Sequence, residues 1–424
     1  MPPSGAKPAL LFLTQRIPYP PIKGEKIRPL QILQRLRRTW DVHLGCLVDD
    51  PRDEAHVPTV AALCADSHFA RLDRRRAKIA CLSGLLSGQA LSVTFYRDRG
   101  LQGWVERVLR DIRPEAIFVC SSNMAPYVLD RRTPRAPGER VCLVDLADVD
   151  SEKWRGYAEA GRFPMAWVHR REWRKTAALE ARIARECDWS TFVTAEEAAL
   201  FAQLQPAQAA RIRAVSSGVD HVYFDPALPA PPPWPASEAG PSSEAGPHYV
   251  FTGTMDYPPN IEAVAWFARA MLPRLQARLP GARFWIVGSS PAPAVQELAA
   301  LPGVVVTGRV PDVRPYLAHA IAVAPMKLAR GIQNKVLEAM AMARPTVATP
   351  QAAEGIAAVA DRELVVAEGE EEFIAACLAL AGEPARAAAI GAAARARVMQ
   401  DYVWEERLRG FDTLLGRAAL QEAA

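Results

Sequence analysis

The sequence predicts an α/β protein of two domains, each with a parallel β-sheet covered by helices on both faces. Short apolar runs rich in Val, Ile and Phe alternate with longer segments of helical periodicity, which is typical of parallel α/β sheets. The runs are nearly continuous, as expected of strands buried on both faces. At roughly 100–200 residues per domain, a chain of 424 residues, half of them hydrophobic, is long enough for two domains.

In the first half, six apolar runs are predicted strands: Ala9–Thr14, Val42–Val48, Ala116–Cys120, Val141–Leu146, Ser190–Thr194 and Ile212–Val215. Helical periodicity predicts helices over Ile27–Arg38, Gln102–Asp111 and Trp167–Glu186. In the second half the predicted strands are Tyr249–Thr252, Arg283–Val287, Val304–Thr307, Ile321–Ala324, Thr346–Ala348 and Leu364–Val366. Helices are expected to begin near Asn260, Ala294, Val313, Ile332 and Glu371.

The segment from Ala227 to His248 separates the two halves. Its density of Pro, Ser and Gly cannot build a packed core, so we expect a linker that is partly extended and partly disordered. The predicted organisation is an N-terminal domain over 1–226, a linker over 227–248, a C-terminal domain over 249–404 and a last helix over 405–424.

Composition excludes several classes of protein. A net charge of +4 is too mild to indicate nucleic-acid binding. The seven cysteines form no C-x-x-C pair, which favours reduced thiols in a cytoplasmic protein. No run approaches the ~20 apolar residues of a transmembrane helix. The basic, amphipathic segment 71–86 fits either a solvated helix face or a helix that binds an anionic membrane surface, which would place the protein peripherally on the inner face of the membrane.

The most informative segment for chemistry is 325–347, which follows a predicted strand and enters a helix. Gly331 allows close approach of the backbone to a ligand, and free amides at a helix start suit a diphosphate. Lys335 and Glu338 share one helix face, where a cation can neutralise phosphate and a carboxylate can accept both ribose hydroxyls. The bare pair also fits a solvated surface ion pair, but the glycine and the strands on either side favour a ligand site.

This segment resembles the donor-site signature of retaining family 4 glycosyltransferases of the GT-B fold, an E-x7-E motif ending in a Leu-Glu-Ala-Met-Ala helix. The resemblance implies that Glu338 binds the ribose of the donor. It also implies that Lys335 contacts the diphosphate, as in relatives that read Gly-x-x-Asn-Lys here, where this chain has Asn334 before the lysine. Arg330 stands where the first Glu of the motif would contact the donor sugar, so the sequence does not identify which sugar the donor carries.

The resemblance continues along the chain and implies two Rossmann-like domains facing a cleft, with the last helix crossing back to the first domain. Segment 250–260 resembles the first strand and loop of the donor domain and includes Gly253. Segment 308–313 resembles the turn in which the backbone of Val310 reads the nucleobase. Segment 16–28 resembles the loop in which a glycine, here Gly24, lies against donor phosphates and acceptor. Segment 141–154 is similar to transferases of exopolysaccharide loci, including those associated with PEP-CTERM/exosortase systems.

The first half of the sequence contains two further candidate sites. Lys23, Lys26 and Arg28 surround Gly24 at a helix start, a pattern that suits a phosphate or an anionic acceptor, although a polar loop with solvated charges has the same composition. Asp148 follows a strand, and three interpretations remain open for it: acceptor positioning or catalysis, a helix cap, or, with Asp150, an Asp-x-Asp metal site of the GT-A kind. Because the C-terminal signature belongs to the GT-B fold, we expect no metal and no cofactor.

The resemblance therefore implies an enzyme that moves a sugar from a UDP- or GDP-sugar donor to a polysaccharide or lipid-linked saccharide, with retention, in exopolysaccharide biosynthesis. Lys335 and Asp148 are the candidate catalytic residues. Two alternatives remain: a nucleotide-sugar 2-epimerase on the same fold, and a non-catalytic nucleotide-sugar-binding subunit.

Overall fold

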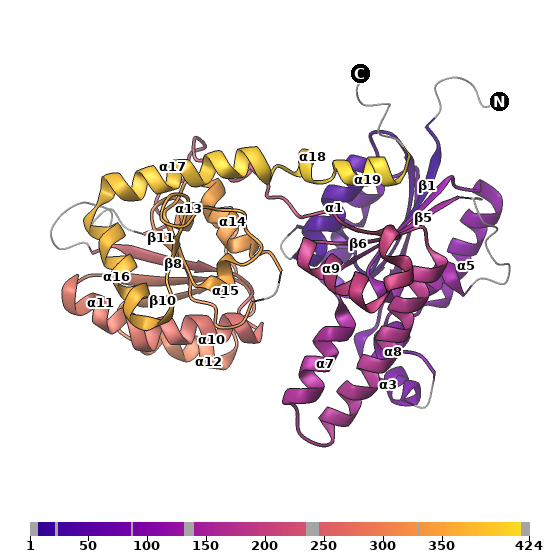
Figure 1. Cartoon of the computed structure of the whole chain (residues 1–424), viewed down its shortest axis with the longest axis horizontal. Helices are drawn as coiled ribbons and strands as arrows, with labels where there is room; N and C mark the ends of the chain where they lie inside the picture. The colour runs from indigo at the N-terminus through magenta and orange to yellow at the C-terminus, as the bar shows by residue number, and fades with distance from the viewer. Residues whose placement is uncertain are drawn as a thin grey trace. The chain divides into compact units, whose positions relative to one another are not determined.

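The computed structural model of the chain describes residues 7–21, 24–85, 88–130, 140–234, 246–329 and 331–416. It divides into two compact units (Figure 1). Unit 1 is Met1–Ser216 with Leu408–Ala424, and unit 2 is Ser217–Arg407. Each unit contains one parallel sheet surrounded by helices, so the predicted fold class is confirmed.

Unit 1 contains a seven-stranded sheet in the order β3-β2-β1-β4-β5-β6-β7. The strands are β1 (Ala9–Thr14), β2 (Asp41–Val48), β3 (Asp66–Arg71), β4 (Ala116–Cys120), β5 (Val141–Ala147), β6 (Trp189–Phe192) and β7 (Ile212–Ala214). The helices described in this unit are α1 (Gly24–Leu36), α2 (Val57–Ala61), α3 (Arg74–Gly84), α4 (Leu91–Phe95), α5 (Arg99–Arg107), α6 (Pro126–Leu129), α7 (Asp150–Ala160), α8 (Met165–Glu186), α9 (Ala195–Leu204) and α19 (Arg409–Leu414). The strand order reverses between β1 and β4, and open α/β sheets bind ligands at such a switch point.

The core of unit 1 explains why its strands are apolar throughout. Residues 10–13 of β1 are fully buried, because helices cover both faces of the sheet. The last described helix, α19, packs on the same sheet: Phe411 makes an edge-to-face contact with Phe118 at 4.9 Å between ring centroids. Arg35 Nε donates to Asp412 Oδ2 at 2.8 Å, which ties α19 to α1.

Unit 2 contains a six-stranded sheet in the order β10-β9-β8-β11-β12-β13. The strands are β8 (His248–Thr252), β9 (Arg283–Val287), β10 (Val304–Gly308), β11 (Ile321–Ala324), β12 (Thr346–Ala348) and β13 (Val365–Val366). The helices described here are α10 (Pro258–Trp266), α11 (Leu272–Arg278), α12 (Pro293–Gln296), α13 (Arg314–Ala318), α14 (Asn334–Ala341), α15 (Pro350–Ala353), α16 (Gly369–Gly382), α17 (Pro384–Asp401) and α18 (Trp404–Arg407). Figure 1 shows helices on both sides of this sheet. Its strand order reverses between β8 and β11.

The predicted linker differs from the expectation over its first part. Trp234 is buried and stacks on His248 at 4.0 Å and on Trp285 at 5.0 Å between ring centroids. His319 Nε2 contacts the carbonyl oxygen of Ala230 at 2.7 Å. Trp234 and the Ala230 carbonyl therefore attach this segment to unit 2, although the other residues of 227–233 are exposed. Residues 235–245 lie outside the described part of the chain.

No single helix within the described residues is both long enough and apolar enough to cross a membrane. Helices α16 and α17 together pass that test on length and composition, with a bend of 104° between them. Several of their apolar side chains, including Phe373 and Cys377, are buried in the core of unit 2.

Candidate active site

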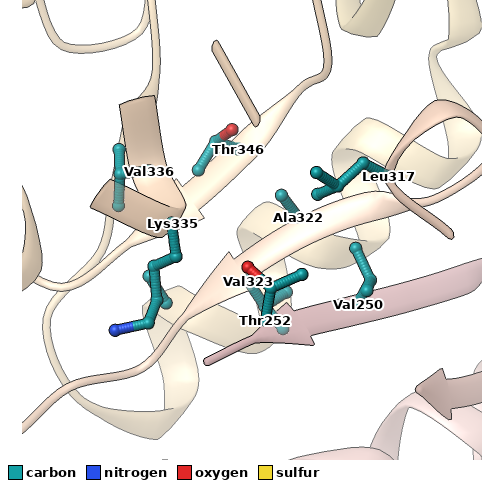
Figure 2. A pocket seen from close by; sticks show the side chains of 9 residues that line it. Val250, Thr252, Leu317, Ala322, Val323, Lys335, Val336 and Thr346 are labelled. Carbon is teal, nitrogen blue, oxygen red and sulfur yellow. The ribbon is translucent and has the colours of Figure 1, made fainter. Parts of the chain in front are cut away.

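The candidate donor site lies at the switch point of unit 2. A small hollow there contains about 210 Å³ of empty space, part of it open to solvent. Residues from β8, β11, β12, α13 and α14 line the hollow: Val250, Thr252, Leu317, Ala322, Val323, Ala324, Lys335, Val336 and Thr346. Figure 2 shows Lys335 reaching down from α14 to the ends of β8 and β11, with its nitrogen pointing away from the apolar lining.

Lys335 is a partly buried cation that forms no salt bridge with a carboxylate among the described residues. Its Nζ lies 3.2 Å from Asn260 Oδ1 and 3.2 Å from Gln333 Oε1. It also lies 5.0 Å from the centre of the Phe251 ring. Burial lowers the pKa of Lys335 to about 8, although the negative charge of Glu338 opposes this shift. Within the described residues no ion pair neutralises this ammonium group, which contradicts the alternative of a solvated surface pair.

Glu338 lies on the same face of α14 and is partly buried. Burial raises the pKa of its carboxyl group to about 7, and the charge of Lys335 reduces that shift. Among the residues that the structure describes, none donates a hydrogen bond to this carboxylate. It is thus available to accept hydrogen bonds from a ligand.

The start of α14 presents unpaired amides. The first described backbone bonds of this helix run from Val336 and Leu337 to the carbonyl oxygen of Gln333. In the described chain the amides of Asn334 and Lys335 have no such partner, as expected at a helix start. Gly331, before the helix, has φ of 65°, a left-handed conformation that favours glycine. This arrangement suits an anion such as diphosphate.

Two further predicted donor residues follow strands of the same sheet: Gly253 comes after β8 and Val310 after β10. A side chain at Gly253 would place its Cβ 2.8 Å from Asn260 Nδ2, so the close approach of Asn260 requires glycine there. Asn260 in turn donates to the carbonyl oxygen of Thr254 at 2.9 Å, which fixes its own oxygen toward Lys335. Val310, after β10, packs its side chain on the core of unit 2, and in the described structure its backbone amide has no partner. Arg330 lies outside the described residues.

The first loop of unit 1 corrects the predicted anion site. Lys26 is buried, and its Nζ lies 2.5 Å from Asp53 Oδ2. Arg28 is also buried and makes two hydrogen bonds to Asp145, of 2.7 and 2.9 Å. Both cations are neutralised inside the fold, so the interpretation of Lys26 and Arg28 as acceptor contacts gives way to a structural role.

The other residues of that loop keep their predictions. Gly24 is exposed at the first position of α1. Lys23 lies outside the described residues. The glycine remains a candidate contact for donor phosphates or acceptor, without the two cations that were expected beside it.

Asp148 is positioned by an unusual backbone. Ala147, the last residue of β5, has φ of 66°, and the pairing of β5 with β6 shifts register between Asp145 and Ala147. Such irregularities turn a side chain out of the sheet and occur at functional sites. Lys153 Nζ lies 2.7 Å from Asp148 Oδ2 and 3.2 Å from Asp150 Oδ1. A lysine thus occupies the space between the two carboxylates of the Asp-x-Asp pattern.

The C-terminal unit matches a known family. Residues 246–383 match the family model described as Glycosyl transferases group 1. This range includes every donor residue predicted in unit 2. The chain is a glycosyltransferase. Among curated proteins none matches the sequence.

Solved structures of glycosyltransferases share the architecture over nearly the whole chain. A sucrose-phosphate synthase from Thermosynechococcus elongatus has a TM-score of 0.66 at 18% identity, covering 99% of this chain and 100% of its own. Anabaena HepE in complex with UDP and glucose has a TM-score of 0.65 at 12% identity, covering 96% and 99%. A glycosyltransferase from Rickettsia africae has a TM-score of 0.63 at 13% identity, covering 97% and 99%. These likenesses show that the chain has the GT-B fold, as predicted.

Sequence reasoning missed three residues of this glycosyltransferase that surround Lys335. Phe251, Asn260 and Gln333 all contact its ammonium group. Gln333 could have been found, since it precedes the predicted helix by one residue. Phe251 and Asn260 lie in segment 250–260, which the resemblance assigns to the donor domain, but their contact with Lys335 could not be predicted, because they approach from β8 and α10, more than seventy residues earlier in the chain.

Proposed function

We propose that this glycosyltransferase uses a UDP- or GDP-sugar and transfers the sugar to a polysaccharide or lipid-linked saccharide, with retention, in exopolysaccharide biosynthesis. The donor class is supported by the group 1 model over unit 2 and by Anabaena HepE, whose structures hold UDP with glucose and UDP-glucose. The acceptor class is supported by the resemblance of segment 141–154 to transferases of exopolysaccharide loci.

The observation that carries this proposal is the environment of Lys335. Its ammonium group is desolvated and touches only neutral oxygens, a thioether sulfur and an aromatic ring among the described residues. Placing a cation there costs stability, and the charge of Glu338 offsets this cost only in part, since burial still lowers the pKa of Lys335 to about 8. A diphosphate at the amides of Asn334 and Lys335 would supply the missing negative charge, and Glu338 would accept the ribose hydroxyls.

The chemistry follows from these groups. The acceptor oxygen forms a bond to the anomeric carbon of the donor, and the bond from that carbon to the diphosphate oxygen breaks. The electron pair goes to the departing nucleoside diphosphate, and the proton of the acceptor hydroxyl leaves with that group or to water. Lys335 and the helix amides stabilise the charge that develops on the leaving group. Asp148 is our candidate for positioning the acceptor in unit 1.

A donor panel tests this proposal. The purified full chain is incubated with UDP- and GDP-sugars, with and without saccharide and lipid-linked acceptors, and free nucleotide is measured. We expect acceptor-dependent release of UDP or GDP, and NMR of the product should show the anomeric configuration of the donor. A new nucleotide sugar without acceptor would instead identify a 2-epimerase, and donor binding without turnover of any kind a non-catalytic subunit.

A further inference from the structure

A helical hairpin projects from unit 1 and carries exposed aromatic side chains at its tip. Helices α7 and α8 run side by side away from the sheet, and α3 lies next to α8 (Figure 1). The tip and the adjoining turns expose Tyr157, Phe163, Met165 and Trp167, with Phe163 at 87% exposure. Helix α3 adds Ile79 and Leu82, exposed at 66% and 68%. We call these six side chains, with the charged residues around them, the tip surface.

The tip surface is held firmly by the helices beneath it. Arg171 of α8 donates to the carbonyl oxygens of Gly84, at 2.8 Å, and Leu85, at 3.1 Å, at the end of α3. Glu172 accepts a 2.7 Å hydrogen bond from the amide of Leu91. These bonds fix α3 against α8, so the two groups of exposed apolar residues belong to one surface.

Helix α7, the other helix of the hairpin, is anchored to α8. Glu180 of α8 accepts hydrogen bonds from both the amide and the hydroxyl of Ser151, in the first turn of α7. Near the tip, the ring of His169 packs against Trp154 and Tyr157, at 5.7 and 5.8 Å between centroids. The exposure of the apolar tip is therefore not a consequence of loose packing.

Positive charge surrounds the apolar residues. On α3 and on residues 155–174 the exposed basic side chains are Arg74, Arg75, Arg76, Lys78, Arg155, Arg162, Arg170 and Arg174. The exposed acidic side chains are Glu159 on the same elements and Asp73 directly before α3. Arg74, Arg76 and Arg155 have carboxylate partners, whereas no ion pair engages Arg75, Lys78, Arg162, Arg170 or Arg174 within the described residues.

We propose that the tip surface docks unit 1 on an anionic lipid bilayer. Tryptophan and tyrosine favour the membrane–water interface, and clustered Lys and Arg side chains are attracted to anionic headgroups. A hairpin that projects from its sheet can enter a headgroup layer. A second copy of the chain is a poor occupant, because apposing two tip surfaces would bring like charges together.

Vesicle binding tests the proposal independently of sugar transfer, because it needs neither donor nor turnover. The full chain is mixed with vesicles of phosphatidylcholine, alone or with about 30% phosphatidylglycerol, and bound protein is measured by flotation. We expect at least tenfold tighter binding to the anionic vesicles, weakening with salt. No binding to either vesicle, or equal binding to both, would overturn the proposal.

Paired variants locate the contact. Phe163→Ser with Trp167→Ser should lower binding at least tenfold, and so should Arg75→Glu with Arg162→Glu, since each basic residue near an anionic surface contributes about fivefold. The matched control is Val222→Ser with Val359→Ser, two exposed side chains of unit 2 at 67% and 47%, which should bind as wild type does. Melting curves establish whether each variant is folded. If one tip pair does not fold, the binding of the other pair is enough to test the assignment. Unchanged binding by a folded tip pair would refute the assignment. So would a wild-type dimer in sedimentation that the tip variants abolish.

Discussion

Replacing Lys335 with alanine should lower kcat for sugar transfer by about 10²–10³-fold, while KM changes less. The reason is that the charge matters most when negative charge develops on the departing diphosphate. Ground-state contacts of the nucleotide, such as those of Glu338 with the ribose, would remain in the variant.

The magnitude follows from the position of the ammonium group. A unit charge about 4 Å from another, at an effective dielectric constant of about 20, interacts by about 4 kcal/mol. Only the part of that energy gained in the transition state raises the rate, which gives the same range as the loss of one oxyanion-hole donor. If Lys335 were a solvated surface lysine, the change would be below about 0.5 kcal/mol in stability and negligible in rate.

The pH dependence gives a second measure of the same group. Burial lowers the pKa of Lys335 to about 8 in the free protein, so the cation is lost as pH rises through that value. We expect kcat/KM to fall above about pH 8, and this limb should be absent in Lys335→Arg, whose guanidinium stays charged.

The assay is steady-state nucleotide release with the donor that the panel identifies. Lys327→Ala is the matched control: this lysine lies in the segment between β11 and α14, half-exposed, with its Nζ 4.7 Å from the centre of the Trp266 ring and 3.8 Å from Glu262. It should retain wild-type kcat. Near-wild-type kcat in a folded Lys335→Ala variant would remove Lys335 from the site and contradict the donor-site assignment.

Other predictions test neighbouring parts of the reasoning. Glu338→Ala should weaken donor binding by about 1.5–3 kcal/mol in calorimetry; unchanged affinity would contradict the ribose contact. Burial raises the pKa of Glu338 from 4.5 to about 7, so this carboxyl group increasingly destabilises the ligand-free fold as pH rises between those two values, and the full penalty is present above about pH 7. Glu338→Gln should therefore melt higher than wild type at pH 8 and at the same temperature at pH 4; an equal shift at both pH values would refute this. Arg28→Met should lower stability by about 3–5 kcal/mol, because it leaves the Asp145 carboxylate buried without its cation; a small change in the melting curve would show that the pair is dispensable. Activity should survive excess EDTA, since Lys153 already bridges Asp148 and Asp150; loss of activity that Mn²⁺ restores would favour a metal site.

Strands in the middle of each sheet were predictable, and so were three of the four edge strands, but the edge strand β3 was not. β1 and β4 lie between other strands and under helices, so their residues are apolar without interruption. β3 reads Asp-Ser-His-Phe-Ala-Arg and has one neighbouring strand. Because only Ala70 of this strand is fully buried, its composition carries no continuous apolar signal.

The same limit explains the errors in the candidate site. Lys26, Arg28 and Lys335 are all cations close to a helix start beside a glycine, and their local sequence does not distinguish them. The partners that do distinguish them are remote: Asp53 is 27 residues from Lys26, and Asp145 is 117 residues from Arg28. Lys335 instead meets Asn260, 75 residues away, through a neutral amide oxygen.

The difference between these partners decides which cation can serve a ligand. A buried carboxylate already supplies the countercharge for Lys26 or Arg28, so an incoming phosphate would have to compete with it and leave a carboxylate unpaired. Asn260 and Gln333 orient the ammonium group of Lys335 without neutralising it. The free enzyme therefore bears the cost of a desolvated charge, which the lowered pKa records, and a bound diphosphate would remove that cost. Asn260→Asp should accordingly place a carboxylate against the ammonium group of Lys335, neutralise its charge and weaken donor binding. If Lys335 were a surface residue, the same substitution would have little effect on affinity.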